Sequence, residues 1–472
     1  MQQKAEFDQR VQEALNNPQL RSNFRIAMDG LMEKRSNAFP DKSFMEELRV
    51  LGSKIRANAL AKQPELLEQL EANCTRNGIQ VHWAETIEQA NRIVLEIMER
   101  HNATRMIKGK SMVSEEMEMN HFLEAQGKSC IESDLGEYII QLDHETPSHI
   151  IAPAIHKSKQ EIAKLFKAKH PDIPYSEDIE TMTRSARQVL RSKFYEAEIG
   201  LSGVNFAVAE TGTLCLVENE GNGRMCTTVP PVHIAVTGIE KVLEKLSDVP
   251  PLLKLLTRSA SGQHISTYFN MISSPRKPGE RDGPKEVHLV LLDNQRSKIY
   301  EDDELFDSLR CIRCGACMNH CPVYTRIGGH AYGSLIPGPI GSCIEPQKFC
   351  LDKFGVLPTA STLCGACGEV CPVKIPLPKL LHRLRYEQVR DDHTGATNGQ
   401  GSQRSGKEAM IWKLWSWAHA NPAVYRSGTR LASLFRGAIP NKIGPWTRVR
   451  TAPKIAPKSL HQLAREEGFD HE

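Results

Sequence analysis

Thirteen cysteines occur in the sequence, and nine of them fall within 61 consecutive residues. The first run reads Cys311-Ile-Arg-Cys314-Gly-Ala-Cys317-Met-Asn-His-Cys321-Pro322. This Cys-x2-Cys-x2-Cys-x3-Cys-Pro pattern is the spacing with which bacterial ferredoxins bind four-iron clusters. In such a tight loop three thiolates can face one cubane cluster. The fourth cysteine lies too far along the chain to bind the same cluster and reaches a neighbouring cluster instead. The spacing therefore predicts iron–sulfur chemistry.

A second, shorter run follows and reads Cys364-Gly-Ala-Cys367-Gly-Glu-Val-Cys371-Pro372. In two-cluster proteins the last cysteine of each run ligates the cluster of the other run. We therefore predict two [4Fe-4S] clusters that exchange one ligand each. The predicted ligands are Cys311, Cys314, Cys317 and Cys371 for the first cluster, and Cys321, Cys364 and Cys367 for the second.

The second run lacks one ligand, because Ser361 stands where a full copy of the first run has cysteine. The fourth position of that cluster is therefore open or filled by an unusual ligand. Cys343 and Cys350 are the nearest spare cysteines, although either could simply be buried. Zinc is the alternative for a single Cys-x2-Cys, but two interlocking runs do not give the two ligand pairs that zinc needs. Disulfides are the weaker alternative in a large chain of intracellular character.

Outside these runs, Gly109-Lys110-Ser111 resembles the end of a phosphate-binding loop. That motif also needs glycine five residues before its last glycine, where Thr104 stands, so we reject a nucleotide-binding P-loop. Lys110 and Ser111 remain candidates for binding an anion at the start of a helix.

A second polar stretch runs from Gly200 to Thr213 and continues through Asn219 and Arg224 to Thr228. Glycine, asparagine, threonine and glutamate at strand ends are what a polar ligand pocket in an open α/β sheet requires. The alternative is ordinary turn chemistry, because glycine and asparagine are also the usual turn residues.

The elements that must position these residues change in character along the chain. Up to about residue 70, apolar residues recur every three to four positions and predict packed helices. From about residue 71, capping signals at Thr86 and Ser158 open amphipathic helices that alternate with short apolar runs. This alternation predicts an α/β domain with a largely parallel sheet that ends near residue 293. The predicted strands are Tyr138–Leu142, Phe206–Ala209, Leu214–Val217, His233–Val236 and His288–Leu292.

The C-terminal part is basic and aromatic. Residues 391–406 are rich in small polar residues and predict a flexible linker. Between residues 407 and 458 there are ten Lys or Arg residues against one acidic residue. Its tryptophans are Trp412, Trp415, Trp417 and Trp446. A nucleic-acid surface is conceivable, but this pattern favours a helix that docks onto a partner subunit, with peripheral contact to anionic lipid as the second alternative.

Composition adds few constraints. Of the 472 residues 40% are apolar and 25% charged, as in ordinary globular proteins, and the net charge of +3 says little about partners. No stretch approaches 18 consecutive apolar residues, so no transmembrane helix is expected. The N-terminus lacks the apolar core of a signal peptide, and we expect a cytoplasmic protein.

Several motifs together resemble a known family. Phe206-Ala-Val-Ala-Glu-Thr-Gly-Thr213, Asn219-Glu-Gly-Asn-Gly223 and Pro230-Pro-Val-His-Ile-Ala-Val236 are similar to the signature of the lactate-utilization domain. Further matching segments are Cys311–Cys317, Gly328–Gly333, Pro337–Gly341 and Leu363–Cys367. From about residue 10 to residue 470, the chain resembles the lactate utilization protein B family.

This resemblance implies a fold and a function. The fold would be an α/β domain (NagB/RpiA/CoA-transferase-like, the sugar-isomerase and CoA-transferase group) with an α-helical two-cluster ferredoxin-like domain and helical N- and C-terminal extensions. The seven predicted ligand cysteines match those that the family uses for two four-iron clusters, and the family pattern does not depend on Cys343. The function would be electron transfer in the oxidation of L-lactate to pyruvate, alongside two partner subunits and an electron acceptor that the sequence leaves unknown.

The predicted regions are a helical N-terminal arm over residues 1–70, an α/β lactate-utilization domain over 71–300, a ferredoxin-type domain over 301–390, and a linker with a basic, tryptophan-containing region over 391–472. Oxidation of a 2-hydroxy acid removes two electrons and two protons, usually as a hydride to a flavin or nicotinamide. The chain has no Gly-x-Gly-x-x-Gly fingerprint and no obvious flavin site, which favours an electron conduit over a complete dehydrogenase.

If lactate does bind in the α/β pocket, Lys110 or Arg224 would contact its carboxylate, and His233 or Glu210 could take its hydroxyl proton. Two alternatives of function stay open. One is an electron-transfer subunit for another 2-hydroxy acid such as glycolate, and the other is a redox-linked ligand-binding regulatory protein.

Overall fold

The structure is a computed structural model, and it describes residues 2–389, 406–438, 440, 442, 447, 451–452 and 454–468. These residues form two compact units. The first comprises residues 2–387, and the second comprises residues 388–389 and those from 406 onward. The region boundaries predicted at residues 70, 300 and 390 stay predictions.

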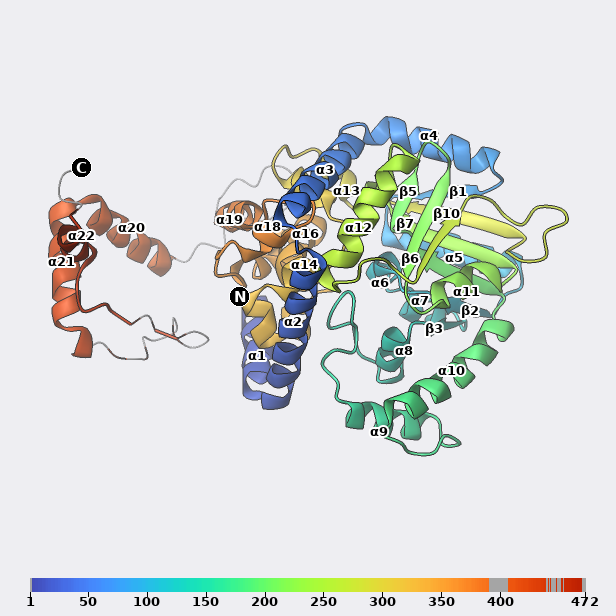
Figure 1. The fold of residues 1–472 in the computed structure, drawn as a ribbon, viewed down its shortest axis with the longest axis horizontal. Helices are drawn as coiled ribbons and strands as arrows, with labels where there is room; N and C mark the ends of the chain where they lie inside the picture. Colours follow the sequence, from blue (N-terminus) through green and yellow to red (C-terminus); the bar gives the residue numbers. More distant parts are fainter. Residues whose placement is uncertain are drawn as a thin grey trace. The chain divides into compact units, whose positions relative to one another are not determined.

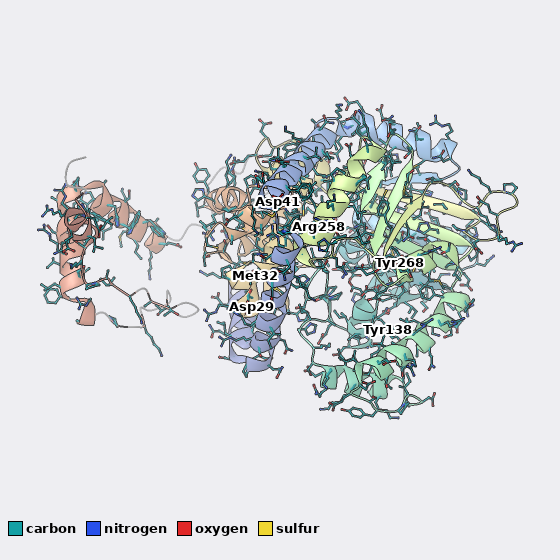
Figure 2. All side chains as sticks on the ribbon, in the orientation of Figure 1. Asp29, Met32, Asp41, Tyr138, Arg258 and Tyr268 are labelled. Atoms are coloured by element: carbon teal, nitrogen blue, oxygen red, sulfur yellow. The ribbon has the colours of Figure 1, made fainter. Side chains whose placement is uncertain are left out.

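The first unit begins with four helices, as the apolar spacing predicts. They are α1 (Gln2–Asn16), α2 (Pro18–Ala38), α3 (Lys42–Ala61) and α4 (Gln63–Arg76). Asn17 caps α2 by accepting a hydrogen bond from the backbone N–H of Leu20 at 3.0 Å. Asp41, labelled in Figure 2, caps α3 in the same way through Phe44 N–H at 3.0 Å. These caps satisfy N–H groups that the first turn of a helix leaves unpaired.

A six-stranded parallel sheet is the centre of the α/β region (Figure 1). Its order is β1 (Gln80–Ala84), β10 (Glu286–Leu292), β7 (Val232–Gly238), β4 (Ile199–Gly203), β2 (Arg105–Lys108) and β3 (Ser129–Glu132). The inner strands β4 and β7 are buried along their whole length. Parallel strands covered on both faces need such continuous burial, and β10 ends at Leu292, as predicted.

A second sheet of four strands was not foreseen. Its order is β8 (Val242–Leu243), β5 (Phe206–Val208), β6 (Thr213–Glu218) and β9 (Tyr268–Ile272). The β5–β8 pair is parallel, and the other two pairs are antiparallel. The predicted strands at Phe206–Ala209 and Leu214–Val217 therefore exist but belong to this mixed sheet instead of the parallel one.

Helices cover the parallel sheet. Thr86 caps α5 (Ile87–Arg100), whose buried face carries Ala90, Val94 and Ile97, and the predicted amphipathic helix is confirmed. The capping box predicted at Ser158 opens α9 (Lys159–Lys169). The remaining helical segments are α6 (Met112–Glu116), α7 (Met119–Ala125), α8 (Leu135–Leu142), α10 (Ile179–Glu196), α11 (Asn222–Thr228), η1 (Ile239–Lys241), η2 (Leu246–Asp248) and α12 (Val249–Ala260).

The strand predicted at Tyr138–Leu142 is wrong, because these residues lie in helix α8. Tyr138 is labelled in Figure 2. Asp134 caps this helix by accepting hydrogen bonds from the N–H groups of Gly136 and Glu137 at 3.0 and 3.2 Å. A short apolar run cannot by itself distinguish a buried strand from a buried helix, and here the aspartate cap decides the outcome.

The cysteine-bearing region is made of short helices beside α2 and α3 (Figure 1). They are α13 (Arg296–Tyr300), η3 (Leu305–Arg310), α14 (Ala316–Asn319), α15 (Pro322–Ile327), η4 (His330–Tyr332), α16 (Gly338–Phe349), α17 (Leu351–Phe354), η5 (Leu357–Thr359), α18 (Ala366–Val370) and α19 (Leu377–Gln388). One hydrophobic core is shared by this region, the N-terminal helices and the second sheet.

The second unit contains α20 (Gly406–Ala420), α21 (Pro422–Leu434), η6 (Arg436–Ala438) and α22 (Leu460–Glu466). Gly406, predicted as the end of the linker, begins α20, and residues 391–405 lie outside the described residues. Trp412 and Trp415 pack edge to face at 5.7 Å and are both more than half exposed. Trp446 also lies outside the described residues. Every helix that the structure describes is too short or too polar to span a bilayer.

A buried ion network connects the sheet to the cysteine-bearing region. Arg296 donates to both carboxylate oxygens of Glu116 at 3.0 and 2.9 Å, and its Nε donates to Glu240 Oε2 at 2.5 Å. Lys348 of α16 pairs with the same Glu116. Burial alone would raise the pKa of Glu240, but Arg296 and Lys241 hold it at about 2. Both carboxylates therefore stay ionised in the interior.

We expect Arg296→Met to destabilise the protein by about 3–5 kcal/mol, because it leaves two buried carboxylates without their main partner. Thermal unfolding of anaerobically prepared protein measures the change. Arg281→Met, at an exposed position of the loop before β10, is the matched control and should unfold like the wild type. Equal melting temperatures for both variants would contradict a structural role of the network.

Candidate iron–sulfur site

The two cysteine runs have the same backbone conformation. Arg313 and Leu363, which precede the Cys-Gly-Ala-Cys segments, have φ angles of 59° and 55°. Gly315 and Gly365 follow with φ angles of 89° and 88°. A non-glycine residue in the left-handed region is strained, and such strain clusters at functional sites. Its recurrence 50 residues later shows that the second run is a structural repeat of the first.

Ser361 occupies the place in the second repeat that Cys311 has in the first. Cys311 Sγ accepts a hydrogen bond from Arg313 N–H at 3.3 Å. Ser361 Oγ accepts the equivalent bond from Leu363 N–H at 3.1 Å. The serine hydroxyl therefore lies where the other loop presents a thiol.

Electrostatic neighbours group the thiols of the first predicted cluster. Burial raises the pKa values of Cys314 and Cys317, and the nearby thiols of Cys311 and Cys371 raise both further. Cys371 comes from the second run, yet it interacts with three cysteines of the first. This grouping agrees with the predicted exchange of the last cysteine, and the ligand assignment itself stays a prediction.

The thiols of the second predicted cluster are grouped in the same way. Burial raises the pKa of Cys367 to about 12, and Cys321 and Cys364 add to this effect. Cys321, from the first run, likewise has Cys364 as its neighbouring thiol. Cys317 interacts with Cys367, so the two groups lie side by side.

The spacing of the sulfur atoms is wider than zinc requires. Within the described part of the chain, which includes all of these cysteines, no three cysteine sulfurs lie within 4.8 Å of one another. Four thiolates around one zinc ion at about 2.3 Å would lie only about 3.8 Å apart. A four-iron cube holds its thiolates on the outer side of separate iron atoms, farther apart, and this larger group fits the arrangement better.

The backbone supports the negative charge that ligand thiolates carry. Cys321 Sγ accepts a hydrogen bond from Tyr324 N–H at 3.5 Å, and Cys371 Sγ accepts one from Ile375 N–H at 3.3 Å. Such bonds to cluster sulfurs help to set the reduction potential. Cys321 and Cys371 are equivalent members of the two repeats, so this support is repeated as well.

Arginines from the N-terminal helices hold both loops, although the sequence indicated no chemistry there. Arg49 donates to the carbonyls of Cys371 and Glu369 at 3.0 and 2.6 Å. Arg56 is buried and donates to the carbonyl of Arg310, next to the first run, at 3.2 Å. Arg49 and Arg56 lie seven residues apart, which places them on one face of α3. The signal in the sequence that could have indicated these contacts was the presence of two arginines on an otherwise apolar helix face.

The two spare cysteines differ in position. Cys343 is buried in α16, and burial raises its pKa, with smaller contributions from Cys367 and Cys311. It therefore lies near one thiol of each predicted group. Cys350 is partly exposed and adopts a φ angle of 73° between α16 and α17.

Two candidates of the α/β pocket lie on neighbouring segments. Lys110 follows β2, and its Nζ donates to Ile151 O at 3.0 Å and lies 3.7 Å from Glu137 Oε1. Arg224 lies on α11, which packs against β2 and β4, and the neighbouring Gly223 lies next to Gly109. The helix start predicted at Ser111 is confirmed, because this residue caps α6.

The other two candidates have different surroundings. Glu210 follows β5 and accepts a hydrogen bond from Leu246 N–H at 2.9 Å. His233 is fully buried within β7, where its Nε2 lies 2.8 Å from Ser202 Oγ. Burial lowers the pKa of His233 to about 3, so the ring is neutral. These two residues lie in other parts of the domain than Lys110.

Known family models match three parts of the chain. They are the LUD domain at residues 67–292, the 4Fe-4S dicluster domain at residues 307–375 and the C-terminal region of lactate utilisation protein B at residues 383–469. The second of these spans both cysteine runs.

Curated relatives match nearly the whole chain. Lactate utilization protein B of Bacillus licheniformis is 41% identical over 459 residues, which are 95% of this chain and 94% of that protein. The chain belongs to the lactate utilization protein B family. A further relative, the uncharacterized electron transport protein YkgF of Escherichia coli K12, is 41% identical over 466 residues, 96% of this chain and 95% of that protein.

A solved structure also shows a partial likeness. The crystal structure of a DUF162 family protein from Deinococcus radiodurans is 14% identical and covers 49% of this chain and 98% of its own. Its TM-score is 0.29, which is too low to define a common fold. The assignment to the lactate utilization protein B family therefore depends on the sequence relatives and family models.

The predicted ligand exchange in this family member can be tested with Cys321→Ser. We expect the variant to damage the cluster held by Cys364 and Cys367 and to leave the other largely intact, because Cys321 lies beside Cys364. Paramagnetic resonance of the reduced protein distinguishes the two. Cys350→Ser, outside both groups, should keep both signals. Loss of only the cluster held by the first run would contradict the exchange.

Ser361 leads to a separate prediction. Neutral oxygen binds cluster iron less strongly than thiolate does, so the iron at this corner should be lost first on oxidation. Mild ferricyanide should then give a three-iron resonance signal in wild type that Ser361→Cys abolishes and that Cys343→Ala and Cys350→Ala leave unchanged. If wild type resists oxidation and one of these alanine variants becomes sensitive, that cysteine is the fourth ligand.

Proposed function

We propose that this protein is the iron–sulfur electron-transfer subunit of a system that oxidises L-lactate to pyruvate. The observation that carries the proposal is the proximity of thiols from both cysteine runs within the region that matches the 4Fe-4S dicluster domain. The substrate comes from the relatives, which are named lactate utilization protein B. The electron-carrying role agrees with the name of the Escherichia coli relative.

The residues present suit two four-iron clusters. Cys311, Cys314, Cys317 and Cys371 would hold one, and the second would be held by the remaining three predicted cysteines with Ser361 at its fourth corner. When bound, such clusters accept and release single electrons. Lactate loses two electrons and two protons on becoming pyruvate, so the hydride chemistry belongs to an organic cofactor such as a flavin, which we assign to a partner subunit.

The exposure of the two groups supports an entry or exit point at the second. Cys364 is exposed, whereas Cys314 and Cys317 are buried. Leu363, beside Cys364, is 37% exposed and offers an apolar contact. We infer that one of two partner subunits exchanges electrons here. Docking of the other through the exposed tryptophans of α20 is part of the same proposal, with contact to anionic lipid as the alternative.

A finer fold assignment also belongs to this proposal. The α/β region would share the fold of the sugar-isomerase and CoA-transferase group. Its six parallel strands with helices on the connections support this assignment. Among the pocket candidates, Lys110 and Arg224 are the pair that could meet a carboxylate together, since their segments adjoin.

Anaerobic purification of the full chain with its partner subunits tests the function. We expect about eight iron and eight sulfide per chain, from two four-iron clusters. L-Lactate should bleach the visible cluster absorption and produce resonance signals of reduced clusters. The complex carrying Cys317→Ser should retain substrate oxidation with an artificial acceptor but lose reduction of the first cluster. Reduction of the clusters by glycolate and not by L-lactate would assign a different substrate. One zinc ion per cysteine run, without iron, would refute the assignment of iron–sulfur clusters.

A further inference from the structure

Three side chains meet at the edge of the parallel sheet where the strands begin. Glu286 and His288 are alternate residues of β10 and therefore point to the same face. His101 follows the last residue of α5, which packs on β1 and β10. The cysteine loops adjoin the opposite edge, where Lys241, after β7, donates to Cys311 O at 3.2 Å. This second cluster of residues is therefore separate from the iron–sulfur site.

The separations of the ligand atoms suit a metal ion. Glu286 Oε2 lies 3.3 Å from His101 Nε2 and 3.6 Å from His288 Nε2, and all three atoms lie within 4.8 Å of one another. Charge-assisted hydrogen bonds between such groups are about 2.7–2.9 Å long. Ligands about 2.0–2.1 Å from a tetrahedral ion are about 3.3–3.4 Å apart. The 3.3 Å separation matches the second arrangement, and the 3.6 Å separation is closer to it than to a charge-assisted hydrogen bond.

Two of these nitrogens have no other partner. The Nε2 atoms of His101 and His288 are buried and make no hydrogen bond within the part of the chain that the structure describes. His288 is 0% exposed. An unsatisfied buried nitrogen costs about 1–3 kcal/mol, so two that converge on one carboxylate require an explanation. A shared cation would satisfy both.

Further contacts orient the ligands. His288 Nδ1 lies 3.0 Å from His82 Nε2, which fixes the ring so that Nε2 faces Glu286. Gln80 Nε2 donates to Glu286 Oε2 at 3.4 Å. Metal-bound histidines and carboxylates usually have such outer partners. The ligand set therefore has the support that a built metal site shows.

The chemistry of the ligand set is also suitable. Glu286 offers a carboxylate oxygen, and a neutral imidazole binds a transition-metal ion through the ring nitrogen that carries no proton.

We propose that His101, Glu286 and His288 bind a divalent transition-metal ion, zinc by the chemistry of the ligand set, with water as the fourth ligand. Two imidazoles and one carboxylate are a common zinc ligand set, and the partly exposed side chains of Glu286 and His101 leave room for water. The ion joins the end of α5 to β10 and stabilises the fold. The proposed site and the cysteine loops lie at opposite ends of parallel strands that are about 20 Å long.

The proposal is tested on the full chain with its clusters, equilibrated anaerobically with zinc and then freed of weakly bound metal by gel filtration. We expect one zinc per chain by elemental analysis. X-ray absorption at the zinc edge should show nitrogen and oxygen ligands at about 2.0–2.1 Å and no sulfur at about 2.3 Å. Sulfur ligands would place the zinc at the cysteine runs and overturn the proposal.

Variants at the partly exposed positions keep the test independent of folding. Glu286→Gln and His101→Gln should each weaken zinc binding at least tenfold, and His82→Gln about 10–100-fold. His264→Gln, at an exposed position elsewhere, is the control and should bind like the wild type. Zinc should raise the melting temperature of the wild type and not of Glu286→Gln. Unchanged zinc affinity in both ligand variants, with metal-free circular dichroism like that of the wild type, would overturn the proposal.

Discussion

One buried guanidinium connects three parts of the chain. Arg56, in the N-terminal helix α3, donates to the carbonyls of Leu309 and Arg310 at the start of the first cysteine run, and to those of Glu240 and Val242 after strand β7. Burial lowers the pKa of Arg56 to about 10, but at neutral pH it stays charged. A buried charge of this kind is tolerated only where its donors are paired, so these four carbonyls must be held in place together. The positions of helix, sheet edge and cysteine loop are thereby coupled.

The ion network around Arg296 extends the same constraint. Glu116 follows β2, Glu240 follows β7 and Arg296 follows β10, so the network gathers the carboxyl ends of three parallel strands. Lys348 brings helix α16 of the cysteine-bearing region to the same point. The iron–sulfur region is thus packed on the edge where open parallel sheets usually bind ligands. The candidates Lys110 and Arg224 lie at that edge as well.

What the sequence could predict was local. Cysteine spacing, the capping signals at Thr86 and Ser158, and the apolar runs of β7 and β10 each depend on neighbours within about ten residues. The structure agrees with the elements that these signals predict. The strand predicted at Tyr138–Leu142 was wrong because burial on all sides of this segment removes the periodicity that distinguishes a helix from a strand. Asp134 nevertheless offered a helix-capping signal. The second sheet was missed because β5 and β6 were assigned to the parallel sheet, and because β9, which pairs with β6, lies about fifty residues farther along the chain.

Long-range charge contacts could not be predicted either. Arg49 and Glu369 are 320 residues apart, and His101 and Glu286 are 185 residues apart, so no spacing rule connects them. Each of these side chains, taken alone, has the ordinary explanation of a solvated helix or strand end. Only the fold shows that Arg49 donates to carbonyls of a cysteine loop, and that the carboxylate of Glu286 lies beside two imidazole nitrogens, the Nε2 atoms of His101 and His288, that make no hydrogen bond within the described part of the chain.

The two cysteine loops share a backbone but not an environment, and this difference has a chemical consequence. Cationic side chains donate to backbone carbonyls of both loops, Arg56 and Lys241 at the first and Arg49 at the second. The second ends in an exposed thiol at Cys364 and a hydroxyl at Ser361. Buried positive charge stabilises the reduced form of a cluster, whereas solvent exposure and ligand type shift its potential independently. A duplicated loop with unequal exposure therefore gives two groups of thiols that are chemically unequal although their backbones repeat.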